Sequence, residues 1–304
     1  MGLASVASKR VLLTGASSGI GRELAKELAS RGASLALAAR RRPLLESLAE
    51  EIGSDGGRPP FVVEADLARP GTARELAEAA GEALGAVDVL INNAGGGVGG
   101  RIAAVGDREE AREAFEINYW SPLALIQALA PQMLERGDGA IVNVSSMAQV
   151  STWPGFGAYA ATKGALSVAT ETLAMEMEGT GVHVMEVLPG PVDTAVQGET
   201  RLAPGIERML KRVPLGDAGT MARRIADGLE RRRKRVIYPR QTAIAYLLPA
   251  LVRWDGRRLA ARTRRELAGE DLSALESLVV RTGSMGDELT RQARDAWEVS
   301  RGRG

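Results

Sequence analysis

Thr14-Gly15-Ala16-Ser17-Ser18-Gly19-Ile20-Gly21 is the stretch of this sequence that decides the fold. It follows a short apolar run typical of a buried strand and begins a segment with helical periodicity. A glycine-rich turn between a strand and a helix presents backbone N–H groups and the positive end of the helix, where a pyrophosphate can bind. Glycine lets the backbone and a phosphate come close. Alone the pattern is weak evidence, because an ordinary strand-to-helix turn can look the same.

The alternation of short apolar runs and helical patterns continues over the first two hundred residues, which indicates repeated βα units. Right-handed crossovers then predict an α/β fold, a doubly wound seven-stranded parallel sheet of Rossmann type. The glycine-rich stretch Gly95 to Gly100 is predicted to be a flexible loop. The predicted strands are Arg10 to Thr14, Ser34 to Ala39, Pro60 to Ala65, Val87 to Ile91, Gly139 to Ser145, Val182 to Leu188 and Val236 to Tyr238, and the predicted helices lie near residues 20–31, 43–52, 71–84, 107–136, 157–178 and 217–232.

We divide the chain into a nucleotide-binding catalytic domain, residues 1–240, and a C-terminal helical extension, residues 241–304. Ligands of such sheets bind beyond the carboxyl ends of the strands. The loops that follow the predicted strands should therefore line one cleft.

The absence of cysteine excludes disulfides, thiolate metal sites and cysteine nucleophiles. The single histidine, His183, excludes a histidine-cluster metal site, so we expect no metal, and its place among apolar residues of a predicted strand indicates a structural role. Met1 to Ala7 carries no targeting pattern, and the apolar run Thr242 to Val252 is too short to span a bilayer. We expect a cytoplasmic protein, with peripheral membrane association as an alternative.

The net charge of +1 conceals an asymmetry along the chain. Residues 201–265 hold 18 basic and 5 acidic side chains, whereas residues 1–200 carry a net charge of −9. A basic run, Arg231 to Arg235, could indicate nucleic-acid binding. The run overlaps the end of a predicted helix, however, where cations are favoured in any case. We therefore expect no nucleic-acid partner.

The second predicted strand ends in Ala38-Ala39-Arg40-Arg41-Arg42, without the acidic residue that holds the ribose hydroxyls of NAD in many such folds. With no carboxylate to repel a 2′-phosphate and Arg40 placed to bind it, the sequence predicts NADP (NADPH) as the cofactor. The competing explanation is composition, because 34 of the 39 basic residues are arginine.

Tyr159 and Lys163 lie four residues apart, hence on one face of a predicted helix. A free tyrosine with a pKa of about 10 is a poor base at neutral pH, and lowering that pKa by about three units takes roughly 4 kcal/mol. One ammonium about 4 Å away, at an effective dielectric constant of about 20, nearly supplies that much, and the positive nicotinamide of the oxidised cofactor would add to it. Ser146 ends a predicted buried strand, where its hydroxyl can hydrogen-bond a substrate carbonyl, and Ser145 is the alternative at that place.

These motifs together resemble the short-chain dehydrogenase/reductase family, over roughly residues 9–238. The matching elements, in order, are Thr14 to Gly21, Asn92-Asn93-Ala94-Gly95, Asn118, Ser146, Tyr159, Lys163 and Pro189-Gly190-Pro191-Val192-Asp193-Thr194.

The resemblance implies a catalytic set of Asn118, Ser146, Tyr159 and Lys163, in which Tyr159 is the general acid/base and Asn118 anchors a water that links Lys163 to solvent. It implies hydride transfer to or from the nicotinamide, a small-molecule carbonyl or alcohol substrate, and a homodimer or homotetramer. The cofactor-binding residues that we expect are Gly15, Ser17, Ser18, Gly19, Ile20, Gly21, Arg40, Asp66, Leu67, Asn92, Ala94, Gly95, Tyr159, Lys163, Pro189, Gly190, Val192 and Thr194. For Asp66, a simple loop cap is the alternative.

The segments that vary in this fold contain the apolar residues Val98, Trp153, Phe156 and Leu202, which suggest a hydrophobic ketone or secondary alcohol. The extension opens with an apolar run flanked by arginines, Ile244 to Trp254, a pattern that suits a membrane surface. From sequence alone we favour the simpler interpretation, a helix packed on its own domain or on a partner subunit.

An NADP-dependent oxidoreductase is thus the leading hypothesis. The alternative from another class is an NADP-binding sensor or scaffold without turnover, because a fold does not establish an activity. The complete reacting set argues against that alternative.

Overall fold

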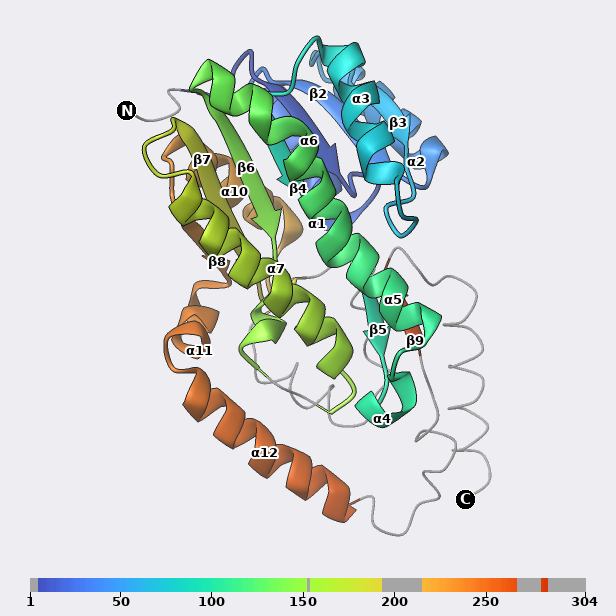
Figure 1. Cartoon of the computed structure of the whole chain (residues 1–304), viewed down its shortest axis with the longest axis vertical. Helices are drawn as coiled ribbons and strands as arrows, with labels where there is room; N and C mark the ends of the chain where they lie inside the picture. Colours follow the sequence, from blue (N-terminus) through green and yellow to red (C-terminus); the bar gives the residue numbers. More distant parts are fainter. Residues whose placement is uncertain (1–4, 152–153, 193–214, 267–279, 284–304) are drawn as a thin grey trace.

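A seven-stranded parallel sheet forms the centre of the fold (Figure 1). The computed structural model describes residues 5–151, 154–192, 215–266 and 280–283. The strands are ordered β3-β2-β1-β4-β6-β7-β8, so the chain winds outward in both directions from the centre, as predicted for a doubly wound sheet. Their bounds are β1 (Arg10–Thr14), β2 (Ser34–Ala39), β3 (Phe61–Glu64), β4 (Val89–Asn92), β6 (Gly139–Val144), β7 (Val182–Pro189) and β8 (Arg235–Tyr238).

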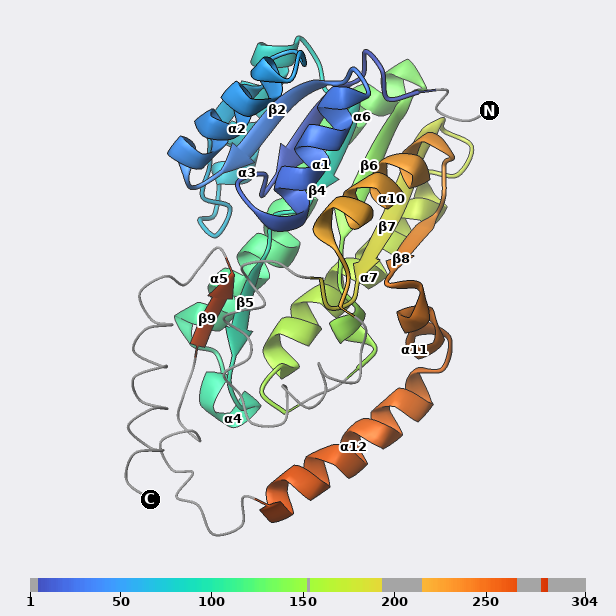
Figure 2. The ribbon, with the colours of Figure 1, turned by 180° about the vertical axis from the view of Figure 1, so that it is seen from behind.

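Helices cover both faces of this sheet. The helices α3 (Thr72–Leu84), α6 (Ser121–Arg136) and α7 (Gly157–Glu176) lie on the face seen in Figure 1. The helices α1 (Gly19–Ser30), α2 (Arg42–Ser54) and α10 (Ala218–Glu230) lie on the other face, seen in Figure 2. Each layer buries its own cluster of apolar side chains against the sheet.

The central strands are buried on both faces, which is why they read as continuous apolar runs in the sequence. Successive side chains of β1 alternate between the two cores: Val11 and Leu13 pack beneath α1 and α10, whereas Leu12 packs beneath α3 and α6. All three are fully buried. The alternation fixes the register, because a slip by one residue would exchange the two faces.

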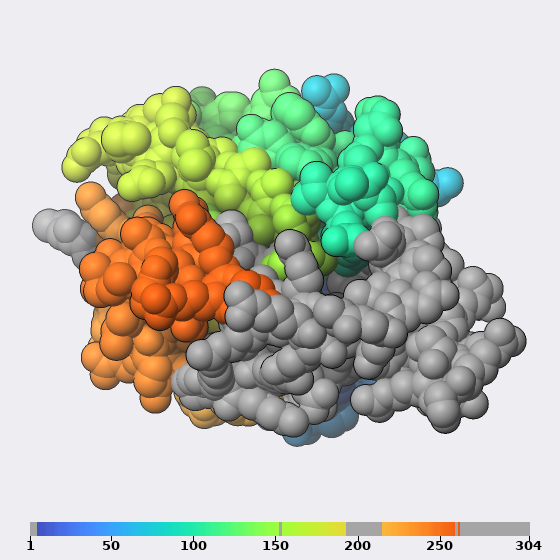
Figure 3. Space-filling view, turned by 90° about the horizontal axis from the view of Figure 1, so that it is seen from below, coloured from blue at the N-terminus to red at the C-terminus, as the bar shows by residue number. Residues whose placement is uncertain are grey.

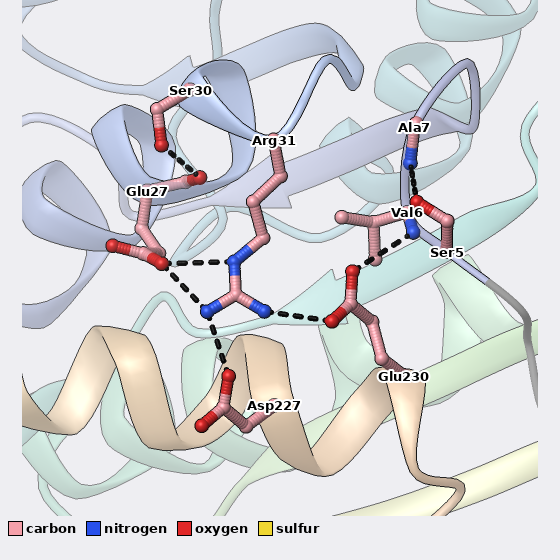
Figure 4. A network of polar contacts seen from close by, with 8 residues as sticks. All are labelled: Ser5, Val6, Ala7, Glu27, Ser30, Arg31, Asp227 and Glu230. Carbon is pink, nitrogen blue, oxygen red and sulfur yellow. Dashed lines mark hydrogen bonds and ion pairs between the residues drawn. The ribbon is translucent and has the colours of Figure 1, made fainter.

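Arg31, which caps the carboxyl end of α1, fastens that helix to α10 (Figure 4). Its guanidinium donates to Glu27 of its own helix, at 2.7 and 2.8 Å, and to Asp227 and Glu230 of α10, at 2.7 and 2.8 Å. Glu230 also accepts a hydrogen bond from the backbone N–H of Val6. The network therefore ties the N-terminal segment and two helices together at one edge of the sheet.

The helix predicted over residues 107–136 is interrupted at its centre. Helix α5 (Glu109–Phe115) passes into a π-helical segment, η1 (Glu116–Trp120), and then into α6. A π-helical turn inserts one residue into the helical repeat and is frequent at functional sites. Here the inserted turn contains Asn118, whose side chain is fully buried.

The prediction of a flexible loop over Gly95 to Gly100 is wrong. Residues Gly96–Gly99 form strand β5, which pairs antiparallel with β9 (Val280–Gly283) from the far end of the chain. The helix α4 (Ile102–Val105) follows β5. Because the partner strand lies so far away in the sequence, local composition gives no sign of this pairing.

The described part of the C-terminal extension is helical in α11 (Ala243–Leu247) and α12 (Pro249–Glu266), as predicted, but it also supplies β9. The term helical extension is therefore incomplete, and the division of the chain at residue 241 stays a prediction. A short 3₁₀ turn, η3 (Arg240–Thr242), joins β8 to α11. Within the described residues, no helix is long and apolar enough to cross a membrane.

His183 lies inside β7 opposite Ala140, in agreement with the structural role inferred from the sequence. Burial, reinforced by the positive charge of Arg232, lowers the pKa of His183 to about 4. The imidazole is therefore neutral at physiological pH.

Candidate active site

The glycine-rich loop quoted from the sequence lies between β1 and α1, where Gly15 adopts a φ of +67° that favours glycine. A Cβ atom at this position would stand 2.7 Å from Cα of Ala94. The loop can therefore approach the end of β4 only because residue 15 has no side chain.

Gly21, in the first turn of α1, meets a similar constraint. A Cβ there would lie 2.2 Å from the carbonyl oxygen of Gly15 and 2.5 Å from Nδ2 of Asn93. The start of α1 thus packs directly on the loop backbone. Such a cradle of bare backbone at a helix N-terminus fits the pyrophosphate of a dinucleotide.

Thr14 and Asn93 join the loop to the end of β4. The Thr14 hydroxyl accepts hydrogen bonds from the backbone N–H groups of Asn93 and Ala94, both at 3.0 Å. The Asn93 amide donates to the carbonyl oxygens of Thr14, at 2.9 Å, and Gly15, at 3.2 Å. Sequence reasoning chose the neighbouring Asn92 and missed Asn93, although both belong to the same quoted motif.

Asn92 lies beneath this layer, buried in the sheet. Its amide donates to Oδ1 of Asn143 on β6, at 2.8 Å, and Asn143 donates to the Thr170 hydroxyl on α7, at 2.9 Å. These bonds link β4, β6 and α7. They give Asn92 a structural role in joining the strands, whereas its predicted contact with cofactor remains a prediction.

Asn118 joins the π-helical turn to β5 and α7. Its amide donates to the carbonyl oxygen of Gly96, at 2.6 Å, and its Oδ1 accepts from the Gly96 N–H, at 3.2 Å. The same amide donates to the Thr162 hydroxyl, at 3.1 Å, and that hydroxyl donates to the carbonyl oxygen of Tyr159. Thr162 is a further residue that sequence reasoning missed.

Lys163 is buried, and its ammonium donates to the carbonyl oxygen of Val144, at 2.9 Å, near the end of β6. The backbone of Gly95 lies between Lys163 and Asn118: a Cβ on Gly95 would be 3.3 Å from the Lys163 Nζ and 3.0 Å from the Asn118 Oδ1. Burial lowers the pKa of Lys163 to about 8. At pH 7 the ammonium is still mostly protonated.

Tyr159 lies one turn before Lys163 on α7, and its phenol forms a hydrogen bond with Ser146. The neighbouring Ser145 is buried and donates to the carbonyl oxygen of Lys163, at 2.9 Å, which holds α7 against the sheet. Of the two serines that the sequence offered, Ser146 is therefore the one beside the phenol. The structure brings Asn118, Ser146, Tyr159 and Lys163 together.

The pKa of Tyr159 shifts in the direction opposite to the one predicted from its spacing to Lys163. Burial raises the pKa of the Tyr159 phenol, and the hydrogen bond with Ser146 opposes that rise only in part. The prediction that a neighbouring ammonium lowers this pKa left out two effects. The phenol is partly removed from water, which raises its pKa, and the Lys163 ammonium donates to the carbonyl oxygen of Val144. Acidity at Tyr159 therefore needs positive charge beyond that of Lys163.

The arginines after β2 point in different directions. Arg41 extends over the phosphate loop, where its guanidinium donates to the hydroxyls of Ser17, at 3.4 Å, and Ser18, at 3.1 Å. Arg42 turns away and pairs with Glu46 within α2, at 2.7 Å. Arg40, the residue chosen from the sequence, is half-buried at the end of the strand. Sequence reasoning chose Arg40 and missed Arg41.

The remaining predicted cofactor residues lie at the same edge of the sheet or outside the described part. Asp66 accepts from the Ala68 N–H, at 3.2 Å, which is the loop cap considered as its alternative. Leu67 is buried, and its carbonyl oxygen accepts from Ser121. Pro189 ends β7 and Gly190 and Val192 follow it, whereas Thr194 lies outside the described residues.

Taken together, these residues combine a glycine-rich cradle at a helix N-terminus with a half-buried phenol, a half-buried hydroxyl and a buried ammonium. The phenol can exchange a proton with a bound oxygen, the Ser146 hydroxyl can hydrogen-bond that oxygen, and the ammonium supplies a fixed positive charge.

Comparison with known proteins agrees with this chemistry. A family model described as short chain dehydrogenase matches residues 9–204. The chain is 43% identical to Dehydrogenase/reductase SDR family member 7B of Mus musculus over 188 residues, 60% of this chain and 58% of that protein. It is 34% identical to 11-beta-hydroxysteroid dehydrogenase 1A of Arabidopsis thaliana over 265 residues, 83% of this chain and 75% of that protein.

A solved short-chain dehydrogenase from Sphingobium yanoikuyae, in complex with NADPH, superposes with a TM-score of 0.69 at 29% identity, covering 84% of this chain and 95% of that one. The match to the mouse protein spans less than two thirds of that protein's length.

The packing of Gly21 generates a test of the cradle. We expect Gly21→Ala to lower the free energy of unfolding by about 1–3 kcal/mol, since the new methyl collides with the backbone of Gly15, and to weaken dinucleotide binding. Urea denaturation and nucleotide titration measure the two effects. Gly81→Ala in α3 is the control, because open space surrounds that position and the change should stabilise by about 0.4–1 kcal/mol. Equal stability of the two variants would contradict the close packing.

Proposed function

This chain belongs to the short-chain dehydrogenase family, and from that premise we propose that it is an NADPH-dependent oxidoreductase. The proposed reaction interconverts a ketone and a secondary alcohol. The observation that carries the proposal is the meeting of the Tyr159 phenol, the Ser146 hydroxyl and the buried Lys163 ammonium beside a dinucleotide cradle.

In the proposed mechanism, Tyr159 passes a proton to or from the substrate oxygen, and Ser146 hydrogen-bonds that oxygen. Lys163 keeps a positive charge close to the phenol and also holds the nicotinamide ribose. Asn118 fixes the depth of α7 against β5 through Gly96 and Thr162. The nicotinamide cofactor, when bound, supplies or accepts the hydride.

NADPH is the proposed cofactor because two arginines, and no acidic residue, lie at the end of β2. The contact of Arg41 with Ser17 and Ser18 supports this choice, since it holds a guanidinium over the loop that would bind the phosphates. A guanidinium can donate two parallel hydrogen bonds to one phosphate group, which the ammonium of lysine cannot do. We assign the 2′-phosphate to Arg40 and Arg41 together.

The proposed substrate is hydrophobic. Val98 on β5 is buried in a small apolar cluster that includes Ala158, the residue before Tyr159, and Phe156 comes directly before α7. Trp153 and Leu202, which the sequence also suggested, lie outside the described residues. The name of the similar Arabidopsis protein, a hydroxysteroid dehydrogenase, points to the same class of substrate.

A sensor or scaffold that binds NADP without turnover is the less favoured alternative, because such a protein would have no need of the complete reacting set. For assembly we propose a homodimer or homotetramer. Trp120 on η1 and Val168 and Met175 on α7 are more than half exposed, which offers an apolar face for a second subunit.

Replacement of Tyr159 by phenylalanine tests the reaction. We expect Tyr159→Phe to lower kcat by about 100- to 10,000-fold, because the variant has no proton to exchange with the substrate oxygen. NADPH oxidation, followed by absorbance across a panel of hydrophobic and polar ketones, measures the effect. NADPH binding, followed by fluorescence, should persist. A fully active phenylalanine variant would refute the acid/base role, and binding without turnover of any carbonyl by the unaltered protein would favour the sensor.

The arginines after β2 allow a matched comparison of cofactors. We expect Arg40→Ala and Arg41→Ala each to raise the Kd for NADPH by about 10- to 100-fold, because each variant loses a charged hydrogen bond to the 2′-phosphate. The Kd for NADH should stay almost unchanged. Arg42→Ala should alter neither constant, because Arg42 pairs with Glu46. Parallel weakening of both nucleotides, or an effect of Arg42→Ala as large as the others, would contradict the assignment.

A further inference from the structure

Five exposed apolar side chains gather on the α11–α12 arm, by which we mean residues 243–266. Ile244, Leu247, Leu248, Leu251 and Trp254 are each at least half exposed, and Leu247 reaches 73%. They make up five of the thirteen exposed large hydrophobic side chains that the structure describes, within a segment of eleven residues. So dense an apolar group at the surface indicates a binding site rather than chance.

These side chains recur at helical spacing and stay on the outside of the arm. Hydrogen bonds from Leu248 N–H to Ile244 and from Leu251 N–H to Leu248 carry the helical turn through the junction of the two helices. From the sequence we favoured packing on its own domain or on a partner subunit, and the contacts of the arm with its own domain leave this face exposed. The exposed residues form one apolar stripe along the arm.

The charge around the stripe is almost entirely positive. Residues 240–265 contain seven arginines and one acidic residue, Asp255. Arg240, Arg253, Arg257 and Arg258 are all exposed, and the Arg258 guanidinium stacks on the Trp254 ring at 3.5 Å. An apolar stripe with tryptophan, bordered by arginines, matches the interface of a bilayer that contains anionic lipids.

Two contacts hold the arm at a defined place on the catalytic domain. The Arg235 guanidinium of β8 lies 4.5 Å from the centre of the Tyr246 ring, and it also donates to the buried Glu186 of β7, at 2.7 Å. Arg253 of α12 donates to the carbonyl oxygen of Val150, four residues after Ser146. The arm is therefore fastened close to the loop that carries the reacting serine.

The arm lies at the end of the molecule toward which the carboxyl ends of the strands point (Figure 1). In the view onto this end, the arm in orange lies beside α7 in yellow-green (Figure 3). A surface that bound the stripe would thus face the same end of the protein as Tyr159 and Ser146.

We propose that the α11–α12 arm is an interfacial anchor for an anionic lipid surface, and that it turns the catalytic end of the sheet toward the bilayer. The anchor lies in the plane of the membrane and does not cross it. The proposal of an anchor is argued from the exposed stripe and its arginines alone. If the substrate also reaches the site from the lipid phase, that step depends in addition on the function proposed above. A second copy of this chain is the competing occupant of the stripe.

The test uses the full chain and vesicles of phosphatidylcholine with or without phosphatidylserine. We expect co-sedimentation with the phosphatidylserine vesicles to exceed that with phosphatidylcholine alone by about tenfold and to fall as salt is added. The triple variant Ile244→Ser, Leu247→Ser, Leu251→Ser should lose at least about tenfold of that binding. Arg240→Gln together with Arg257→Gln should remove the dependence on phosphatidylserine.

The matched control is Phe61→Ser with Leu134→Ser, which removes exposed apolar side chains from β3 and α6, away from the arm and from the proposed subunit face. This control should bind vesicles as the unaltered chain does. Equal binding by the triple variant and the control would overturn the proposal. So would analytical ultracentrifugation showing a dimer that the triple variant dissociates, without vesicle binding by the unaltered chain.

A second readout separates this inference from the proposed function. The triple variant should keep its turnover of a water-soluble ketone and lose about tenfold of its turnover of a ketone dissolved in phosphatidylserine vesicles. Equal turnover of the vesicle ketone by the variant and the unaltered chain would overturn delivery from the membrane, whereas the proposed function fails only if the unaltered chain reduces neither ketone.

Discussion

The burial of the Lys163 ammonium is the constraint on which the rest of this site depends. A charged group leaves water only if other atoms replace its hydration, and here the Val144 carbonyl does so at 2.9 Å. That bond draws α7 onto the end of β6, and Ser145 strengthens the same junction through the Lys163 carbonyl. Tyr159, one turn earlier, is thereby placed against Ser146. The position of the phenol is thus a consequence of how the lysine is buried.

The π-helical turn around Asn118 meets this junction from the opposite side. An uninterrupted helix over residues 109–136 would place residue 118 at a different angle, whereas the inserted turn directs its amide at Gly96 and Thr162. Through Gly96 the same amide holds β5, which pairs with β9 from the end of the chain. A strand from the C-terminal part of the chain is therefore linked to α7 through β5 and Asn118.

The sequence predicted the sheet well because its central strands are buried on both faces, so that β1 and β2 appear as apolar runs with the observed bounds. It selected the proposed reacting residues by their types and spacing, and the structure brings Tyr159 into contact with Ser146. The sequence did not predict the pairing of β5 with β9, because no local pattern indicates a partner strand so far away in the chain. It chose Arg40 among three adjacent arginines and missed the contact of Arg41 with the loop, and it did not reveal that burial raises the pKa of Tyr159, because both depend on where the side chains lie.

In the proposed mechanism, the oxidised cofactor adds positive charge to that of Lys163 and so lowers the pKa of Tyr159, against the opposing effect of burial. The most direct test is the tyrosinate absorbance of the unaltered chain minus that of Tyr159→Phe, titrated with pH in the presence and absence of NADP⁺. We predict that the pKa of this one phenol lies above its ordinary value without NADP⁺ and falls when NADP⁺ binds. A pKa that stays the same or rises on binding would contradict the account.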